Sequence, residues 1–424
     1  MSGIALFEDS HWQSFSPITL TRAVFDVKVG ARSFFEEYRQ VPEILLTREY
    51  VAAVTHERHG QCRINPDSVD EDTVFVNGLL HPNSIDIDRL LGINHTFAIM
   101  SGNRLLVARL VKKGIEYLKD CVFLDKKIDS KKLYVDKDTQ LGMQDAQGLL
   151  SEPWDIIRAL ENSLSMQVAI SAPRDHLNVG EGVKVIGKGS VVVARDSEIE
   201  DGTVLDTRKG GIYIGSQSRV APSRIVGPTY IGDKTQIKQF SVIETSSIGY
   251  NCRVAGEIEH SIISDHTNKA HAGFLGHSYV GEWANLGAMT TTSDLKMTYG
   301  DIKMDSPTGQ AKVDTGMNKL GSFFADMCKT SVGTLVYSGR RIGVSCHLHG
   351  LISQDVPSFT IYGSSIGAKS AELRLDSAIE TQRKMMARRD QKMSKAYEQM
   401  MREVFSMTSP DRKHARVRKT KFSL

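Results

Sequence analysis

The residues best suited to acid-base or metal chemistry are four histidines in the middle of the chain. His260, His266, His271 and His277 fall within 18 residues. A neutral imidazole accepts a proton near pH 7 and is also a common metal ligand. His266 and His271 form an H-x4-H pair, but no histidine occurs between positions 176 and 260. A catalytic zinc site built on this pair would lack a third histidine ligand, which disfavours the metal interpretation.

A six-residue period predicts the element that must position these histidines. Ile225, Ile231, Ile237 and Ile243 are spaced by six, and an Ile-Gly or Val-Gly pair recurs at 214, 231, 248 and 280. In a parallel β-helix each hexapeptide forms one face of a triangular coil, with one aliphatic side chain inside and a small residue at the corner. We therefore expect a parallel β-helix over residues 166–365, with roughly 18 residues in each coil.

A β-sandwich with irregular strands is the alternative for this region. Its inward positions would alternate every second residue, with turns roughly every 8 to 12 residues, unlike the period seen here. Residues 286–319 break the period with polar and Gly residues, and the aliphatic steps return in TSVGTLVYSGRRIGVSCHLHGLI. We expect residues 286–319 to form a long loop that leaves the coil.

The segments that flank the repeat have other patterns. Over residues 1–165, the apolar runs IALF, EILL, TVFVN and HTFAIM alternate with helical spacing in ARSFFEEYRQ, NRLLVARLVKKGIEYLKD and EPWDIIRALENSLS. This alternation predicts an α/β domain. Residues 366–424 are expected to be a C-terminal helix, AELRLDSAIETQRKMMARRDQKMSKAYEQMMREVFSM, and a basic tail. Its Met residues favour a packing face over a ligand site.

The composition indicates a folded protein of two or three domains. The chain has 424 residues, of which 40% are hydrophobic and 24% charged. No apolar run reaches the roughly 20 residues of a membrane span, and the start resembles no signal peptide. The five cysteines are odd in number and form no C-x-x-C, which argues against disulfides and structural zinc. We expect a soluble, cytoplasmic protein.

The charge of the chain gives no reason to expect a nucleic-acid partner. The formal net charge is +3, and residues 410–424 alone hold six Lys or Arg and one Asp. The excess of positive over negative charge therefore lies in the C-terminal tail. Such a tail is more typical of a solvated terminus than of a nucleic-acid arm.

The stretch NKAHAGFLGHSYVGEWANLGA, followed by SDLK, resembles a known acetyltransferase site. The family is the bifunctional N-acetylglucosamine-1-phosphate uridyltransferase/glucosamine-1-phosphate acetyltransferases, and the likeness is greater still to its variant archaeal and bacterial sugar nucleotidyltransferase branch. The resemblance implies a left-handed β-helix with His271 as the catalytic base. It also implies substrate contacts by Lys269, Asn285, Asp294 and Lys296, and acetyl-CoA contacts by Ala288, Thr330 and Ser331.

The chemistry of acetyl transfer explains these residue types. A glucosamine amine loses a proton as it attacks the thioester, and an imidazole that titrates near pH 7 can accept that proton. Backbone N–H groups at a rigid corner can stabilise the developing oxyanion. Three positions depart from the family: Phe274 replaces a tyrosine, Met289 a glycine, and Glu259 a lysine that contacts the sugar phosphate. Lys269, Lys296 or the pair Arg340 and Arg341 would have to replace that lysine.

The N-terminal region resembles the same family more faintly. LFEDSHWQSFSPITLTRAVFDVKVG lies where sugar-1-phosphate nucleotidyltransferases carry a Gly-rich loop, and the resemblance implies nucleotide contacts by Thr19, Arg22, Asn77 and Gly78. A triphosphate needs closely spaced backbone N–H groups and no nearby anions. This loop has no glycines and carries Glu8 and Asp9.

The N-terminal region lacks the family's magnesium ligand at its usual position. In TVFVNGLLH, Leu79 follows Gly78 where the family has a magnesium aspartate. Either Asp9 or Glu8 replaces that aspartate, or the domain binds nucleotide without catalysing.

Taken together, these patterns predict a transferase of sugar-nucleotide biosynthesis. It would couple a sugar 1-phosphate to a nucleoside triphosphate with Mg²⁺ and would acetylate an amino-sugar phosphate from acetyl-CoA. The family's acyl-CoA cleft lies between neighbouring coils of a trimer, so we expect a homotrimer. The alternatives are an acyltransferase with a non-catalytic N-terminal domain, a metal-dependent lyase or hydratase similar to the β-helical carbonic anhydrases, and a non-catalytic assembly protein.

Overall fold

The computed structural model describes residues 3–38, 40–135, 140–142, 148–170, 180–306 and 311–423. The chain forms two compact units. The N-terminal unit comprises Met1–Val27, Arg32–Glu152 and Lys395–Met400, and the β-helix unit comprises Lys28–Ala31, Pro153–Ser394 and Met401–Leu424. The helix from residue 153 therefore groups with the β-helix, whereas the sequence placed the boundary at residue 165.

The N-terminal unit is built on a seven-stranded mixed sheet, as the α/β assignment predicted. Its strand order is β3-β2-β1-β4-β6-β5-β7. β2 and β4 pair with β1 in parallel, whereas β6 is antiparallel to both of its neighbours. The strands are β1 (Ile4–Phe7), β2 (Ile44–Leu46), β3 (Arg63–Ile64), β4 (Val74–Asn77), β5 (Phe97–Ser101), β6 (Arg104–Arg109) and β7 (Gln140–Gly142).

Two segments of this unit with helical spacing fold differently. Residues 104–109 form β6 because their backbone pairs with β4 on one side and β5 on the other, which overrides the local period. Within the described residues of ARSFFEEYRQ, a 3₁₀ turn at Phe35–Glu37 takes the place of the expected helix. The α-helices of the unit are α1 (Glu49–Arg58), α2 (Ile87–Leu91) and α3 (Lys112–Phe123).

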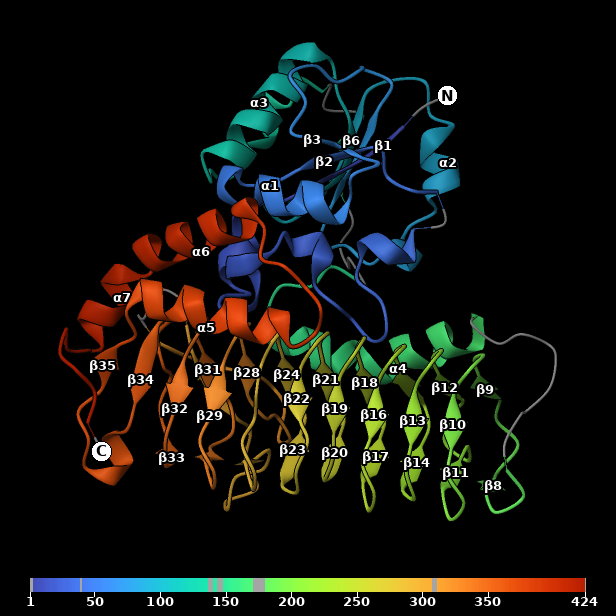
Figure 1. Cartoon of the computed structure of the whole chain (residues 1–424). Coiled ribbons are helices and arrows are strands. Elements are labelled where there is room, and N and C mark those ends of the chain that lie inside the picture. The colour runs from blue at the N-terminus through green and yellow to red at the C-terminus, as the bar shows by residue number, and fades with distance from the viewer. Residues whose placement is uncertain are drawn as a thin grey trace. The chain divides into compact units, whose positions relative to one another are not determined.

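The β-helix unit is a stack of coils with three faces, which confirms the predicted left-handed parallel β-helix (Figure 1). The first face contains β8 (Lys184–Ile186), β11 (Val204–Asp206), β14 (Arg224–Val226), β17 (Val242–Glu244), β20 (Glu257–Glu259), β23 (Phe274–Gly276), β25 (Thr291–Thr292), β30 (Leu335–Val336) and β33 (Leu351–Ile352). The second contains β9 (Val191–Val193), β12 (Ile212–Ile214), β15 (Thr229–Ile231), β18 (Ser247–Ile248), β21 (Ile262–Ile263), β24 (Tyr279–Val280), β28 (Phe323–Phe324) and β31 (Arg341–Ile342). The third contains β10 (Glu198–Ile199), β13 (Arg219–Val220), β16 (Gln236–Ile237), β19 (Arg253–Val254), β22 (Asn268–Lys269), β29 (Lys329–Thr330), β32 (His347–Leu348), β34 (Thr360–Tyr362) and β35 (Ala371–Glu372).

One aliphatic side chain from each face fills the interior of each coil. In the first face Ile225, Ile243, Ile258 and Leu275 lie in register on consecutive strands, and each has a relative exposure of 0%. The six-residue period is therefore the period of the core.

The predicted loop over residues 286–319 contains structure of its own. β25 continues the first face and pairs with β30. Beyond it, β26 (Lys303–Asp305) and β27 (Lys312–Asp314) form an antiparallel pair. β24 pairs directly with β28, so the coil closes across the inserted segment.

The helices outside the coils differ from the prediction at the C-terminus. The helix α4 (Pro153–Ile170) precedes the coils. The expected single C-terminal helix is instead α5 (Leu375–Ala387), α6 (Lys395–Met407) and α7 (Ser409–His414). The break contains Asp390, whose φ of 55° no α-helix accommodates. Met386, Met400 and Met401 are buried, in agreement with a packing role.

All five cysteines are buried and none forms a disulfide. Within the described ranges, we find no helix whose length and apolar character would allow it to cross a membrane.

Candidate functional site

His271 lies at the corner between β22 and β23, and its side chain is exposed. The preceding Lys269 is 1% exposed, and its Nζ donates to the carbonyl oxygens of Ala255 at 3.0 Å and of His271 itself at 2.9 Å. Burial lowers the pKa of Lys269 to about 8. The resemblance implied a substrate contact for Lys269, but the structure turns it inward, where it holds the backbone that carries His271.

Asn285 occupies the next rung of the same face. It forms bridges to Asn268 on β22 and to Lys329 on β29. Nδ2 of Asn268 donates to Oδ1 of Asn285 at 3.4 Å, and Nη2 of Arg389 donates to Oδ1 of Asn268 at 2.7 Å. Sequence analysis did not identify Arg389. This residue lies in the turn that follows α5, 121 positions from Asn268, and only the folded structure brings the two together.

The three acetyl-CoA candidates lie on adjoining rungs. The carbonyl of Ala288 accepts the N–H of Gly333 at 2.8 Å. Oγ1 of Thr330 accepts the N–H of Gly287 at 2.8 Å and is 7% exposed. Ser331 is half-buried, with Oγ 3.3 Å from Oγ1 of Thr334. The structure therefore brings Asn285, Ala288, Thr330 and Ser331 together. The hydroxyl of Thr330 is engaged by the backbone N–H of Gly287.

His347 lies beyond these rungs on the same face, paired in register with Lys329. Burial, followed by the charge of Lys329, lowers the pKa of His347 to about 4. His347 is therefore neutral at pH 7 and holds a proton too weakly to be an effective base. Exposed His271 remains the candidate for proton transfer on this side of the coil.

Asp294 and Lys296 follow β25, at a different corner of the coil. Oδ2 of Asp294 accepts a hydrogen bond from Nδ1 of His277 at 2.7 Å, and Asp294 is 8% exposed. Nζ of Lys296 donates to the carbonyl of Asp301. Both side chains therefore have partners within the protein, although the sequence assigned both to substrate.

The H-x4-H pair is divided between the two ends of β22. His266 precedes the strand and stacks on Trp283, with ring centroids 4.1 Å apart, whereas His271 follows the strand. Among the described residues, the group with metal-ligating geometry is instead Glu259, His260 and His277.

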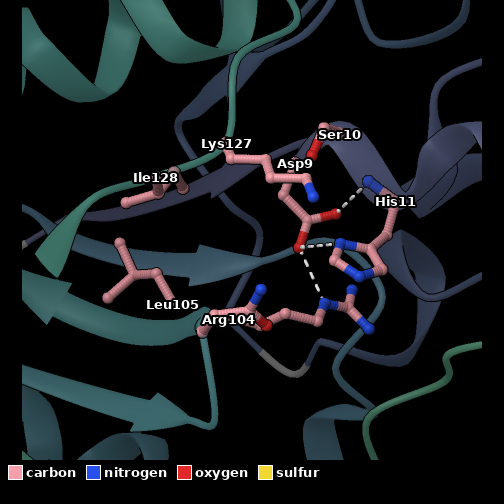
Figure 2. A pocket seen from close by; sticks show the side chains of 8 residues that line it. Asp9, Ser10, His11, Arg104, Leu105, Lys127 and Ile128 are labelled. Atoms are coloured by element: carbon pink, nitrogen blue, oxygen red, sulfur yellow. Dashed lines mark hydrogen bonds and ion pairs between the residues drawn. The ribbon is translucent and has the colours of Figure 1, made fainter.

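In the N-terminal unit, the candidate metal ligand Asp9 is already bound by other side chains. Figure 2 shows its carboxylate between His11 and Arg104. Oδ2 of Asp9 accepts from Nε of Arg104 at 2.9 Å and from Nδ2 of Asn77 at 2.8 Å, and Oδ1 accepts the N–H of His11 at 3.0 Å. The hollow beside Asp9 encloses about 10 Å³, room for a water molecule rather than a nucleotide.

Glu8, the other acid of this loop, is also fully engaged. It is 1% exposed and accepts from Nε and Nη2 of Arg48, both at 3.0 Å, and from the N–H of Val24 at 2.8 Å. The guanidinium of Arg48 lies 3.9 Å from the ring centroid of Trp12. The residues present therefore do not fit a magnesium site, because binding would first have to displace an arginine from either acid.

The four nucleotide-binding candidates are likewise interior. Thr19 is 0% exposed and its Oγ1 donates to the carbonyl of Trp12 at 2.7 Å; Arg22 is 1% exposed. Asn77 bonds to Asp9, and the N–H of Gly78 donates to the carbonyl of Phe7 at 2.8 Å. The loop that should hold a triphosphate is a packed polar network in this structure.

Comparison with known proteins gives a family match for the N-terminal part of the chain and relatives among bifunctional enzymes. Residues 4–172 match the family model described as sugar nucleotidyl transferase. A bifunctional sugar-1-phosphate nucleotidylyltransferase/acetyltransferase of Sulfurisphaera tokodaii is 24% identical over 214 residues, which cover 49% of this chain and 46% of that protein. The bifunctional protein GlmU of Rippkaea orientalis is 27% identical over 144 residues, which cover 28% of this chain and 31% of that protein. These relatives confirm the resemblance, and the chain spans less than half of their length.

Among solved structures, the UDP-N-acetylglucosamine acyltransferase from Campylobacter jejuni has a TM-score of 0.32 and 12% identity. The match covers 53% of this chain and 95% of that one. At this level of similarity the comparison adds nothing to the fold described above.

Proposed function

We propose that this chain, a relative of the bifunctional sugar-1-phosphate nucleotidylyltransferase/acetyltransferases, transfers an acetyl group from acetyl-CoA to the amine of an amino-sugar phosphate. The observation that carries the proposal is the position of His271. Its side chain is exposed at a corner of the coil, and the buried Lys269 donates a hydrogen bond to its backbone carbonyl. The transfer takes place in the β-helix unit.

The residues around His271 have separate roles in this reaction. The imidazole accepts the proton that the sugar amine loses as it attacks the thioester carbonyl. Asn285, half-buried on the adjoining rung, orients the sugar by hydrogen bonds. The backbone N–H of Ala288 stabilises the oxyanion, because corner backbone in a stacked coil cannot reorient. Thr330 supports that backbone through its bond to Gly287.

One assay tests the proposal. The purified protein is incubated with glucosamine 1-phosphate and acetyl-CoA, and the products are identified by mass. We expect N-acetylglucosamine 1-phosphate and free coenzyme A. Hydrolysis of acetyl-CoA without transfer, or no reaction with any amino-sugar phosphate, would contradict the proposal.

For the N-terminal unit, nucleotidyl transfer is the activity that the relatives' names suggest. A second candidate is favoured by the ion pairs of Glu8 with Arg48 and of Asp9 with Arg104: a domain that no longer catalyses, so that the protein is an acyltransferase only. Arg48 and Arg104 occupy the carboxylates of Glu8 and Asp9, which a catalytic metal ion would need as ligands.

Calorimetry with each nucleoside triphosphate separates these two candidates. If the transferase is active, binding should require Mg²⁺ and should weaken in Arg22→Ala. If no triphosphate binds under either condition, the acyltransferase-only candidate holds. Binding that needs no metal and persists in Arg22→Ala would place the phosphates away from this loop.

We further propose that the protein is a cytoplasmic homotrimer. Five buried thiols without a disulfide suit a reducing compartment. The trimer is tested below.

A further inference from the structure

Two histidines lie one above the other at a corner of the coil that the acetyl-transfer site does not use. His260 follows β20 and His277 follows β23, and these strands are neighbours in the first face. Their rings stack, with centroids 4.9 Å apart and an angle of 4° between the planes. Glu259, the last residue of β20, lies beside them, and one ligand atom from each of the three falls within 4.8 Å of the others.

The residue one coil further along, Asp294, fixes the orientation of His277. The carboxylate accepts the hydrogen bond from Nδ1 of His277 at 2.7 Å, and both side chains are nearly buried. This arrangement assigns the proton to Nδ1 and leaves the lone pair of Nε2 for a ligand. A carboxylate behind an imidazole is the usual companion of a metal-bound histidine, because it raises the basicity of the ligating nitrogen.

The second histidine has one nitrogen without a partner. Nδ1 of His260 is buried and, within the described part of the chain, has no hydrogen-bond partner. Its Nε2 lies 3.5 Å from Oε2 of Glu161, which belongs to α4 in the same unit. The carboxylate of Glu161 therefore engages only one of the two ring nitrogens of His260.

The charges around the two rings favour a cation. Three carboxylates contact the imidazoles or belong to the cluster: Glu161, Glu259 and Asp294. Two lysines oppose them: Nζ of Lys319 lies 3.2 Å from Oε1 of Glu259, and Lys209, which bonds to Glu244, also interacts with the charges of Glu161 and Glu259, so the carboxylates remain in excess by one. The side chains of Lys319 and Glu259 are 48% and 29% exposed, so their ion pair is of the weak, solvent-screened kind. A divalent ion could displace Lys319 at little cost.

We propose that Glu259, His260 and His277 bind a divalent transition-metal ion, with Zn²⁺ the best match. Two imidazoles and one carboxylate form a donor set that suits zinc and its neighbours, whereas Mg²⁺ and Ca²⁺ prefer oxygen ligands throughout. Asp294 positions His277 by accepting the hydrogen bond from its Nδ1. The ion joins two successive coils at the base of the inserted segment.

The proposal does not depend on the acetyl-transfer function, because metal binding is measured without any acyl substrate. The chelator-treated protein is titrated with Zn²⁺ by calorimetry, and bound metal is counted by mass spectrometry. We expect one ion per chain. His277→Ala should lower the affinity by at least 100-fold, and Asp294→Asn, which keeps the shape of the side chain, should lower it by roughly 10- to 100-fold.

Two histidine variants serve as controls. His349→Ala removes an imidazole that stacks on Phe422 outside the cluster, and it should leave the affinity unchanged. His266→Ala removes the first histidine of the H-x4-H pair, which lies outside the proposed site, and it should also leave the affinity unchanged.

Glu259→Gln, at a half-buried position, repeats the test of the site if His277→Ala fails to fold.

Co²⁺ provides an independent readout, since nitrogen and oxygen ligation in a tetrahedral site gives visible absorption bands. These bands should appear with wild type and be lost in His277→Ala. No Zn²⁺ binding by the wild type, equal binding by wild type and His277→Ala or Glu259→Gln, or loss of binding in His266→Ala alone would overturn the assignment.

Discussion

At the scale of single residues, the side chains that could do chemistry differ in what surrounds them. His271 is exposed, whereas His266 stacks on Trp283 and His277 is held by Asp294. An imidazole that must take a proton from a substrate has to be reachable, so exposure separates His271 from the others.

Replacement of His271 should affect acetyl transfer and little else. We expect His271→Ala to lower the rate of acetyl transfer by about 10² to 10⁴, the usual contribution of a general base. The melting temperature should stay the same, because the side chain is exposed. His56→Ala, an exposed histidine on α1, is the matched control. An unchanged acetylation rate in His271→Ala would remove it from the mechanism.

The buried Lys269 should make stability depend on pH. Its pKa in the folded protein, about 8, lies below the ordinary value of 10.5, so between these pH values the unfolded chain binds more protons than the folded one. The free energy of unfolding should therefore rise from about pH 8 to pH 10.5, with Lys269 contributing on the order of 3 kcal/mol, and stay flat below pH 8 as far as this group is concerned.

Urea unfolding at several pH values measures this contribution. Lys269→Met should lose its share of the rise. Lys329, whose pKa burial also lowers to about 8, retains its own share and provides the comparison. An identical pH dependence in wild type and Lys269→Met would contradict the assignment.

At the scale of elements, the coil derives its stability from one interior side chain per face. Ile243 of β17 is 0% exposed between Ile225 and Ile258, while its neighbour Val242 points outward and is 39% exposed. The same strand therefore offers a core position and a surface position side by side.

Truncation of these two neighbours should have very different costs. Ile243→Ala should lower the free energy of unfolding by about 2 to 5 kcal/mol, because rigid rungs above and below cannot close the cavity. Val242→Ala should change it by less than about 1 kcal/mol. Both are measured by urea unfolding, and equal effects would mean that the interior of the coil is not a close-packed core.

At the scale of the whole molecule, the proposed trimer is supported by apolar side chains exposed around the acetyl-CoA candidates. Met289, Val332, Leu335 and Tyr337 are 56%, 75%, 48% and 51% exposed. Gly333 donates to the carbonyl of Ala288, so the segments that carry these residues are neighbours. Large apolar side chains gathered on one surface are typical of an interface.

Light scattering tests the trimer. The wild type should have three times the chain mass of 47.0 kDa. Leu335→Asp should shift the mass toward the monomer and reduce acetyl transfer, whereas Leu124→Asp, on the N-terminal unit and 58% exposed, should do neither. A stable wild-type monomer at micromolar concentration would contradict the trimer.

The sequence by itself determined the fold class of both units. An interior that accepts one aliphatic residue per face imposes its six-residue period directly on the chain, and the buried strands at residues 4–7 and 74–77 are short apolar runs. Only the tertiary structure decided which polar residues meet. The coil length of 17 residues places positions 260, 277 and 294 at one corner, a signal that the sequence contains but that has meaning only once the coil is known. Glu8 and Arg48 are 40 residues apart, and nothing in their local patterns indicates that each neutralises the other. Local periodicity specifies what is buried, because burial repeats along an element, whereas contacts between corners and loops depend on how the elements stack.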